Sequence, residues 1–163
     1  MNSYLDPSGR QIESRTTQGL GLYVHIPFCI KKCDYCDFNS YSIDSFDDAR
    51  ETVNRYLAAL LKEAEIQSAA VRELGVEVVT VYLGGGTPTC LSKESLRLLV
   101  TEVLRVFPMA HNAEITVEAN PGTVDSRKLD CLRDTGVTRL SIGIQSLNDN
   151  LLQKLVRAHS ASD

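Results

Sequence analysis

Residues 20–36 read LGLYVHIPFCIKKCDYC, an apolar run that leads directly into three closely spaced cysteines. Residues 20–26 have the composition of a β-strand, and Cys29, Cys33 and Cys36 follow it with the spacing C-x3-C-x2-C. Thiolates this close in sequence are typical ligands of a metal centre, and three of them leave an iron–sulfur cube one ligand short. The stretch therefore predicts a strand that ends at a cluster-binding loop, with one iron open to a small molecule.

The composition restricts the class of protein. With 163 residues, 43% of them hydrophobic and 23% charged, the chain is expected to be globular with one ordinary core. A net charge of −4 without a basic run argues against a nucleic-acid partner, and no stretch approaches the roughly 18 apolar residues of a membrane span. The N-terminus lacks the basic end and apolar run of a secretory signal, so we expect a cytoplasmic location, where clustered cysteines favour metal binding over disulfides.

Strand and helix patterns alternate along the chain. Residues 1–19 are polar without periodicity, so we expect a disordered lead-in there and one structured domain over residues 20–163. Helices are predicted over residues 45–74, 93–107, 125–134 and 149–158, and further strands over residues 76–83, 114–119 and 137–144. Gly75 is expected to end the first helix and Ser92 to cap the second.

Four successive β–α units predict an α/β fold with a parallel sheet and right-handed crossovers. Four units are too few to close a barrel, so we expect a partial (β/α) barrel and a truncated product or a fragment.

Each predicted strand has one polar face. Because side chains alternate along a strand, the polar faces consist of Tyr23 and His25 in the first strand, Thr116, Glu118 and Asn120 in the third, and Ser141, Gly143 and Gln145 in the fourth. In a parallel sheet the face away from the helices usually lines a lumen or cleft. We therefore favour a ligand-lining role for these faces over plain solvent exposure.

Residues 84–89, GGGTPT, directly follow the strand predicted over residues 76–83. Glycines allow a ligand to approach the backbone closely, so such a turn can bind through its main-chain groups. Alone it would be a weak signal, because the lysine of a phosphate-binding loop is missing and a plain tight turn has the same sequence. Beside a cysteine loop at the end of the preceding strand, it strongly indicates a binding site.

A zinc site is the alternative reading of the cysteines. His25 could complete a Cys3His set with the three thiols, which would make the chain a zinc-binding structural fold without catalysis. Zinc would explain neither the glycine turn nor the polar strand faces. We therefore favour the cluster, with His25 in the core or in a supporting role.

Four ordered motifs, YVHIPFCIKKCDYC, YLGGGTPT, ITVEANPGT and RLSIGIQSLN, resemble those of radical S-adenosylmethionine (SAM) enzymes. The resemblance covers residues 20–160 and is closest to the group that contains oxygen-independent coproporphyrinogen III oxidase and the haem chaperone HemW. It implies a partial (β/α) barrel of the radical SAM type, in which Cys29, Cys33 and Cys36 hold a [4Fe–4S] cluster whose open iron chelates SAM. One electron from the cluster, received from a donor such as flavodoxin or ferredoxin, would cleave SAM to methionine and a 5′-deoxyadenosyl radical.

The same resemblance implies roles for residues outside the cysteine spacing. Tyr35 would pack on the adenine, with ordinary core packing as the alternative. Gly85, Gly86 and Thr87 would hold the methionine amino end through backbone groups. The remaining cofactor-site positions implied are Tyr23, Glu118, Gln145 and Arg157, although a surface-helix role explains Arg157 equally well. No residue is assigned a catalytic role.

The resemblance also separates two activities. The oxidases carry a further cysteine two residues after the last ligand, where this chain has Phe38, so the chain looks more like the haem chaperone, with haem as cargo and haemoproteins as clients. The alternative is oxidative decarboxylation of porphyrinogen propionates. The chaperone's haem-ligating motif, HN-x2-YW, is absent, because His111-Asn112 lacks the rest of it and the chain contains no tryptophan.

Overall fold

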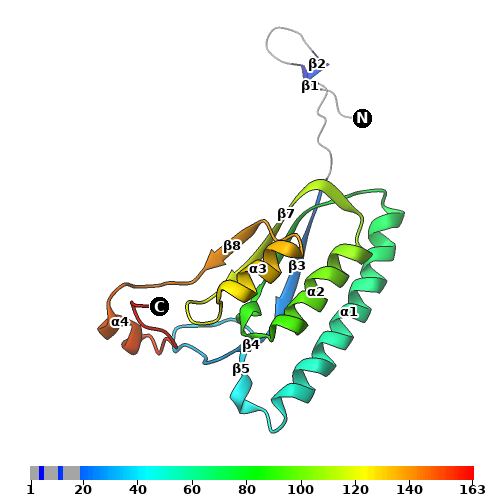
Figure 1. Ribbon diagram of the computed structural model, residues 1–163. Helices are drawn as coiled ribbons and strands as arrows, with labels where there is room; N and C mark the ends of the chain where they lie inside the picture. Colours follow the sequence, from blue (N-terminus) through cyan, green and yellow to red (C-terminus); the bar gives the residue numbers. More distant parts are fainter. Residues whose placement is uncertain (1–3, 6–10, 13–18) are drawn as a thin grey trace.

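The computed structural model describes residues 4–5, 11–12 and 19–163 (Figure 1). Strands β1 (Tyr4–Leu5) and β2 (Gln11–Ile12) form an antiparallel pair. The lead-in expected to be disordered falls almost wholly outside the described residues, so it stays a prediction.

A four-stranded parallel sheet forms the centre of the fold. Its order is β3-β6-β7-β8, with β3 at Leu20–Ile26, β6 at Val78–Gly85, β7 at Met109–Ala119 and β8 at Arg139–Ile142. All three neighbouring pairs are parallel. The predicted α/β class with a parallel sheet is confirmed.

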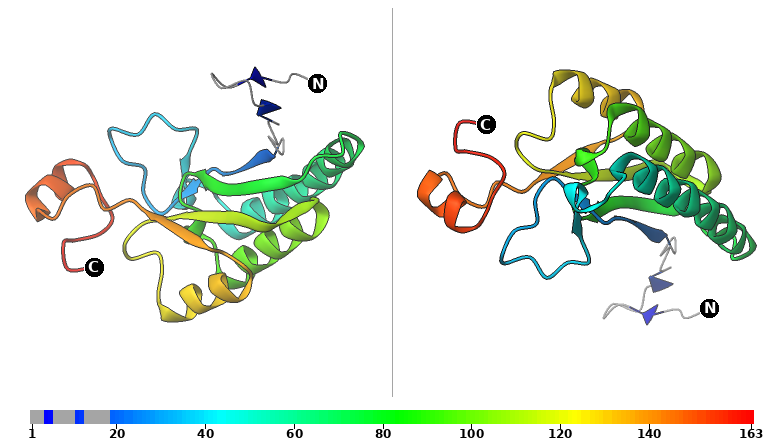
Figure 2. Two further views of the ribbon diagram at one scale, coloured as in Figure 1. Left: turned by 90° about the horizontal axis from the view of Figure 1, so that it is seen from above. Right: turned by 90° about the horizontal axis from the view of Figure 1, so that it is seen from below.

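Three helices cover one face of this sheet (Figure 2). They are α1 (Ala49–Glu73), α2 (Lys93–Val106) and α3 (Ser126–Asp134), while the short α4 (Asp149–Lys154) lies beyond the carboxyl end of β8. None of the helices in the described residues is long and apolar enough to cross a bilayer, and the cytoplasmic location stays a prediction.

Local capping decides where the helices begin and end. The first helix begins at Ala49 rather than near residue 45, because the Asp48 side chain accepts a hydrogen bond from the Glu51 N–H and residues Ile43–Ser45 form a separate 3₁₀ turn, η1. Gly75, at φ 64°, follows the end of α1 as predicted. Ser92 caps α2 as predicted, by accepting from the Ser95 N–H.

Three strands and one further helix differ in extent from their predicted ranges. Strand β8 is confined to Arg139–Ile142, inside the predicted range 137–144. Strand β6 runs into the glycine segment, because Gly84 and Gly85 still pair with β3, and β7 begins already at Met109. Helix α4 stops at Lys154, well short of residue 158, and Val156 beyond it adopts a left-handed φ of 57°.

The hydrophobic core lies between the sheet and the helices. Val81, Leu83 and Val117 from the sheet and Leu96 and Leu99 from α2 are at most 1% exposed. Burial of these side chains fixes the sheet against its helices, and thereby fixes the positions of the loops at the strand ends.

Candidate functional site

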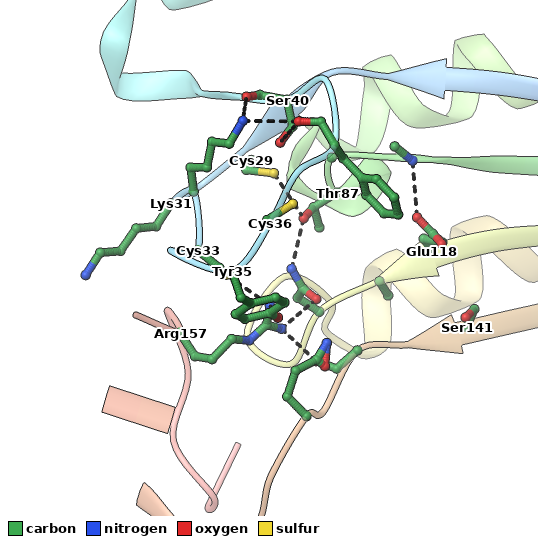
Figure 3. Close-up of a pocket in the computed structure, with 18 residues that line it drawn as sticks. Cys29, Lys31, Cys33, Tyr35, Cys36, Ser40, Thr87, Glu118, Ser141 and Arg157 are labelled. Atoms are coloured by element: carbon green, nitrogen blue, oxygen red, sulfur yellow. Dashed lines mark hydrogen bonds between the residues drawn. The ribbon is translucent and has the colours of Figure 1, made fainter. Parts of the chain in front are cut away.

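A pocket of about 170 Å³ opens at the carboxyl ends of the parallel strands (Figure 3). The loops that follow β3, β6, β7 and β8 meet there. The predicted site residues that line it are Cys29, Cys33, Tyr35, Cys36, Gly85, Gly86, Thr87, Glu118, Gln145 and Arg157. Residues far apart in sequence therefore share one cavity, and of the predicted set Tyr23 alone is outside its lining.

The loop that carries the cysteines is closed at its base. Strand β4 (Phe28–Cys29) pairs in parallel with β5 (Tyr41–Ser42), which joins the two ends of the loop. Inside the loop, the Lys32 ammonium donates to the carbonyl oxygens of Phe38 at 3.1 Å and Ser40 at 3.0 Å. Neither this small sheet nor the bracing role of Lys32 was predicted from the sequence.

The thiols lie in different surroundings. Burial raises the pKa of Cys29, whose sulfur accepts a weak hydrogen bond from the Thr87 hydroxyl at 3.7 Å. The Cys33 sulfur accepts from Arg157 Nη1 at 3.3 Å. At Cys29, burial outweighs the hydrogen bond from Thr87, which acts on the pKa in the opposite direction.

In the zinc alternative His25 would be the fourth ligand, but both of its ring nitrogens already form hydrogen bonds. Nε2 must donate to the Asn39 carbonyl oxygen at 2.9 Å, so in the neutral ring Nδ1 accepts from the Tyr23 hydroxyl at 3.1 Å. Within residues 19–163 and the two short described segments before them, no three potential ligands gather around one point. A Cys3His site would require His25 to give up a hydrogen bond and the thiols to converge.

The glycine segment packs directly against the cysteine loop. A Cβ atom on Gly86 would lie 2.5 Å from the Phe28 oxygen and 3.0 Å from the Cys29 sulfur, so glycine is required for this approach. The N–H groups of Gly86 and Thr87 donate to the carbonyl oxygens of Ile26 and Phe28. Because these donors are used within the protein, the segment can offer a ligand acceptors rather than donors.

Glu118 is held by two hydrogen bonds at the end of β7. The Tyr82 hydroxyl donates to Oε1 at 2.6 Å, and the Gly85 N–H donates to Oε2 at 3.2 Å. The hydrogen bond to Glu118 is the main cause that raises the pKa of Tyr82, so the phenol keeps its proton and remains a donor. Tyr23 stacks on Tyr82 with ring centroids 6.2 Å apart and reaches the site only through that ring.

Arg157 joins three walls of the pocket. Its Nη1 donates to Cys33 and to the Tyr35 hydroxyl, at 3.3 and 3.2 Å, and its Nη2 donates to Asn120 Oδ1 and the Gly143 oxygen, at 2.8 and 2.6 Å. The residue lies beyond the end of α4 and lines the pocket, so the surface-helix alternative is wrong.

Two features of the Arg157 position are typical of binding sites. The Nε of Arg157 is buried without a hydrogen-bond partner, which is costly unless a ligand supplies one. The residue before it, Val156, has φ 57°, and Gln145 has φ 63°. A left-handed β-branched residue is a genuine outlier, and such strain concentrates at functional sites.

Asn120 lines the pocket, although the sequence analysis assigned it no specific role beyond a place on a ligand-lining strand face. Its Nδ2 donates to the Thr87 hydroxyl at 2.9 Å, and its Oδ1 accepts from Arg157. The amide thereby links the glycine segment to the arginine across the pocket. The alternation along β7 had placed Asn120 on the same face as Glu118, and the quoted motif ITVEANPGT contains it, so both signals could have identified it.

The donor set suits a particular kind of ligand. Thiolates are the usual ligands of iron–sulfur clusters, and a cube spreads them over separate irons rather than around one ion. The unpaired Nε of Arg157 and the carboxylate of Glu118 line the same pocket as the thiols. A polar molecule bound next to a cluster could therefore use one as a donor and the other as an acceptor.

Comparisons with family models and with known proteins all indicate the same family. The chain matches the model of the Radical SAM superfamily over residues 23–163. It is 42% identical over 142 residues to the "Heme chaperone HemW" of Bacillus subtilis and 40% identical over 147 residues to the protein of that name from Escherichia coli. These matches cover 86% and 88% of this chain and 36% of each relative, so the chain spans just over a third of the length of the curated relatives it matches.

Among solved structures, the chain is similar to coproporphyrinogen III oxidase (HemN) from Escherichia coli, described as a radical SAM enzyme. The TM-score is 0.74 at 33% sequence identity, over 87% of this chain and 31% of that one. The family match includes every residue that lines the pocket, and the solved structure shares the sheet that positions them. The chain belongs to the radical SAM superfamily.

Proposed function

We propose that this chain is the cofactor-binding part of a radical SAM haem chaperone, and that it holds a [4Fe–4S] cluster through Cys29, Cys33 and Cys36 with SAM in the adjoining pocket. The observation that carries this proposal is the single cavity in which the three cysteines meet the glycine segment, Glu118 and Arg157. When bound, the cluster supplies a low-potential electron to the sulfonium of SAM.

The residues of the pocket offer complementary groups to SAM. The half-exposed ring of Tyr35 provides an aromatic surface for the adenine. Glu118 accepts from hydroxyl or ammonium groups, and the unpaired Nε of Arg157 donates to an anionic or oxygen-rich group. The backbone of Gly85 and Gly86 presents acceptors that suit the methionine ammonium.

Phe38 and the relatives favour a chaperone over an oxidase. Phe38 lines the pocket and is 61% exposed, at the position where the oxidases are expected to carry a further cysteine. The curated relatives quoted above bear the name of a haem chaperone. Haem as cargo and haemoproteins as clients follow from that name, whereas the likeness to HemN supports oxidative decarboxylation of porphyrinogens as the second candidate.

Anaerobic reconstitution tests the cluster. The chain should take up about four irons and about four sulfides. Cys33→Ala should abolish this uptake, whereas Cys131→Ala, a substitution on α3 away from the pocket, should leave it unchanged. Stoichiometric zinc without iron–sulfur absorbance would reject the cluster and restore the zinc alternative.

A chimera tests the chaperone. Residues 23–163 of this chain would replace the matching part of the Bacillus subtilis relative, because the haem-ligating motif is absent from this chain. Under anaerobic conditions with SAM and a reductant, the chimera should bind haem stoichiometrically and leave coproporphyrinogen III intact. Decarboxylation of that substrate would favour the oxidase instead.

A further inference from the structure

Lys128 joins two of the loops that build the pocket, although it does not line the pocket itself. Its ammonium donates to three backbone carbonyl oxygens, those of Thr89 at 2.7 Å, Leu91 at 3.1 Å and Thr123 at 2.9 Å. Thr89 is the last residue of the glycine segment GGGTPT and Leu91 follows that segment, whereas Thr123 belongs to the loop after β7. All three donors of one ammonium group are thus used to hold two chain segments together.

The position of Lys128 in its helix explains how the side chain reaches these carbonyls. Asp125 caps α3 by accepting from the Lys128 N–H at 2.7 Å, which places Lys128 in the first turn. Side chains of a helix lean toward its N-terminus, so the ammonium turns back over the preceding loop. A cation is disfavoured at this end of the helix dipole, and the three carbonyl dipoles offset that disadvantage.

Hydrogen bonds connect the braced loops to the pocket. The hydroxyls of Thr89 and Thr123 lie 2.6 Å apart, and both side chains are buried. The Thr123 hydroxyl also accepts from the Asn120 N–H at 3.1 Å. Asn120 in turn donates to Thr87 and accepts from Arg157 inside the pocket.

We propose that Lys128 is a positioning residue, which holds the segment after the glycines against the loop after β7 so that Thr87, Asn120 and Arg157 meet in the pocket. The surface of α3 gives a contrast. Arg133, on the same helix, pairs with the exposed carboxylates of Asp130 and Asp134. The positioning role concerns the walls of the pocket, and its consequence for SAM rests on the proposed function.

Hydrogen–deuterium exchange on the complete 163-residue chain, without cofactor, tests the role directly. The amides of Thr87, Leu91, Asn120 and Thr123 are all hydrogen-bonded and therefore report on the walls. In Lys128→Met these amides should exchange about tenfold faster, while the amides of β3 and α1 keep their wild-type rates. Arg133→Met, the matched control, should leave all of these rates unchanged.

Conservative variants separate positioning from a general loss of folding. Lys128→Arg keeps a cation with several donors and should recover part of the protection. If Lys128→Met also exposes β3 and α1, then Lys128→Gln, which keeps two donors, should still loosen the walls selectively. Wild-type exchange at Thr87 and Asn120 in both Lys128→Met and Lys128→Gln would overturn the proposal.

Binding of SAM to the reconstituted protein shows the consequence. Lys128→Met should retain its iron and bind SAM about tenfold more weakly by calorimetry, because the walls no longer hold one geometry. Wild-type affinity despite loosened walls would overturn the positioning role. Failure of the wild-type chain to bind SAM would reject the proposed function, while the exchange rates would still decide whether Lys128 holds the walls.

Discussion

The face of the sheet that meets the helices and the face that turns away from them differ within single strands. Along β6, Leu83 is fully buried against the core, whereas its neighbour Tyr82 points to the other face and donates to Glu118. Along β7, Val117 is fully buried and Glu118 lines the pocket. One face supplies packing energy and the other lines the pocket, so substitutions on the two faces should affect different measurements.

The largest effect is expected on the helix face. Leu83→Ala should lower the free energy of unfolding by about 2–5 kcal/mol, because it leaves a cavity in a fully buried site. Denaturant titration of the apo chain measures this loss. Val79→Ala, at a 36% exposed position of the same strand, is the control and should change stability far less. Equal losses in both variants would contradict the attribution of the loss to the burial of Leu83.

The opposite face should respond through binding. Glu118→Ala should leave the cluster in place and weaken SAM binding by about 1–3 kcal/mol, the scale of a charge-assisted hydrogen bond. Calorimetry on the reconstituted protein measures the affinity. The control is Glu114→Ala, at an exposed residue of the same strand that pairs with Arg139. Unchanged affinity in Glu118→Ala would give this carboxylate a purely structural role.

The repeating part of the fold could be predicted from sequence. Apolar periodicity depends only on neighbouring residues in the sequence. It therefore identified the strands of the sheet, the helices that cover it, and the residues that alternate between the two faces of each strand. The predicted ends of elements were less accurate in two places. The first helix begins later than its apolar pattern indicates because Asp48 caps it, and β6 continues because Gly85 still pairs with β3. These outcomes depend on hydrogen bonds that periodicity does not encode.

The site was predictable only as far as its motifs extend. Motif resemblance identified the cysteines and Glu118, because their residue types are distinctive. It also implied Arg157 but left a surface-helix role open, because periodicity does not encode the left-handed Val156 that precedes the turn of this side chain into the pocket. It could not reveal Lys128, whose three acceptors come from loops brought together only by the folded sheet.

Cys90 tests the boundary between the two regions, because it directly follows the GGGTPT segment yet packs against the core. Burial raises the pKa of this thiol from 9.0 to about 12. The folded state therefore favours the protonated thiol, and its stabilising contribution is present below pH 9 and lost as the pH rises toward 12. Between pH 8 and 10.5, the wild type should lose about 1–2 kcal/mol more stability than Cys90→Ala.

Denaturant titrations at pH 8 and pH 10.5 measure how much the free energy of unfolding changes with pH in each variant. The stability that Cys90→Ala loses through its smaller side chain is the same at both pH values, so it cancels from this change. Cys131→Ala is the matched control and should follow the wild-type pH dependence. Identical slopes for the wild type and Cys90→Ala would show that the thiol is solvated and belongs with the open pocket rather than with the core.

The smallest effect should come from the hydroxyl of Tyr82. Tyr82→Phe keeps the ring that stacks on Tyr23 and removes only the 2.6 Å hydrogen bond to Glu118, so SAM binding should weaken by about 0.5–1.5 kcal/mol. Tyr23→Phe is the control, since that hydroxyl bonds to His25 and not to Glu118. Because Tyr82 acts through Glu118, adding Tyr82→Phe to Glu118→Ala should cost little further affinity. Additive losses would mean that the phenol contacts the ligand itself, and would extend the binding surface from the end of β7 onto the open face of β6.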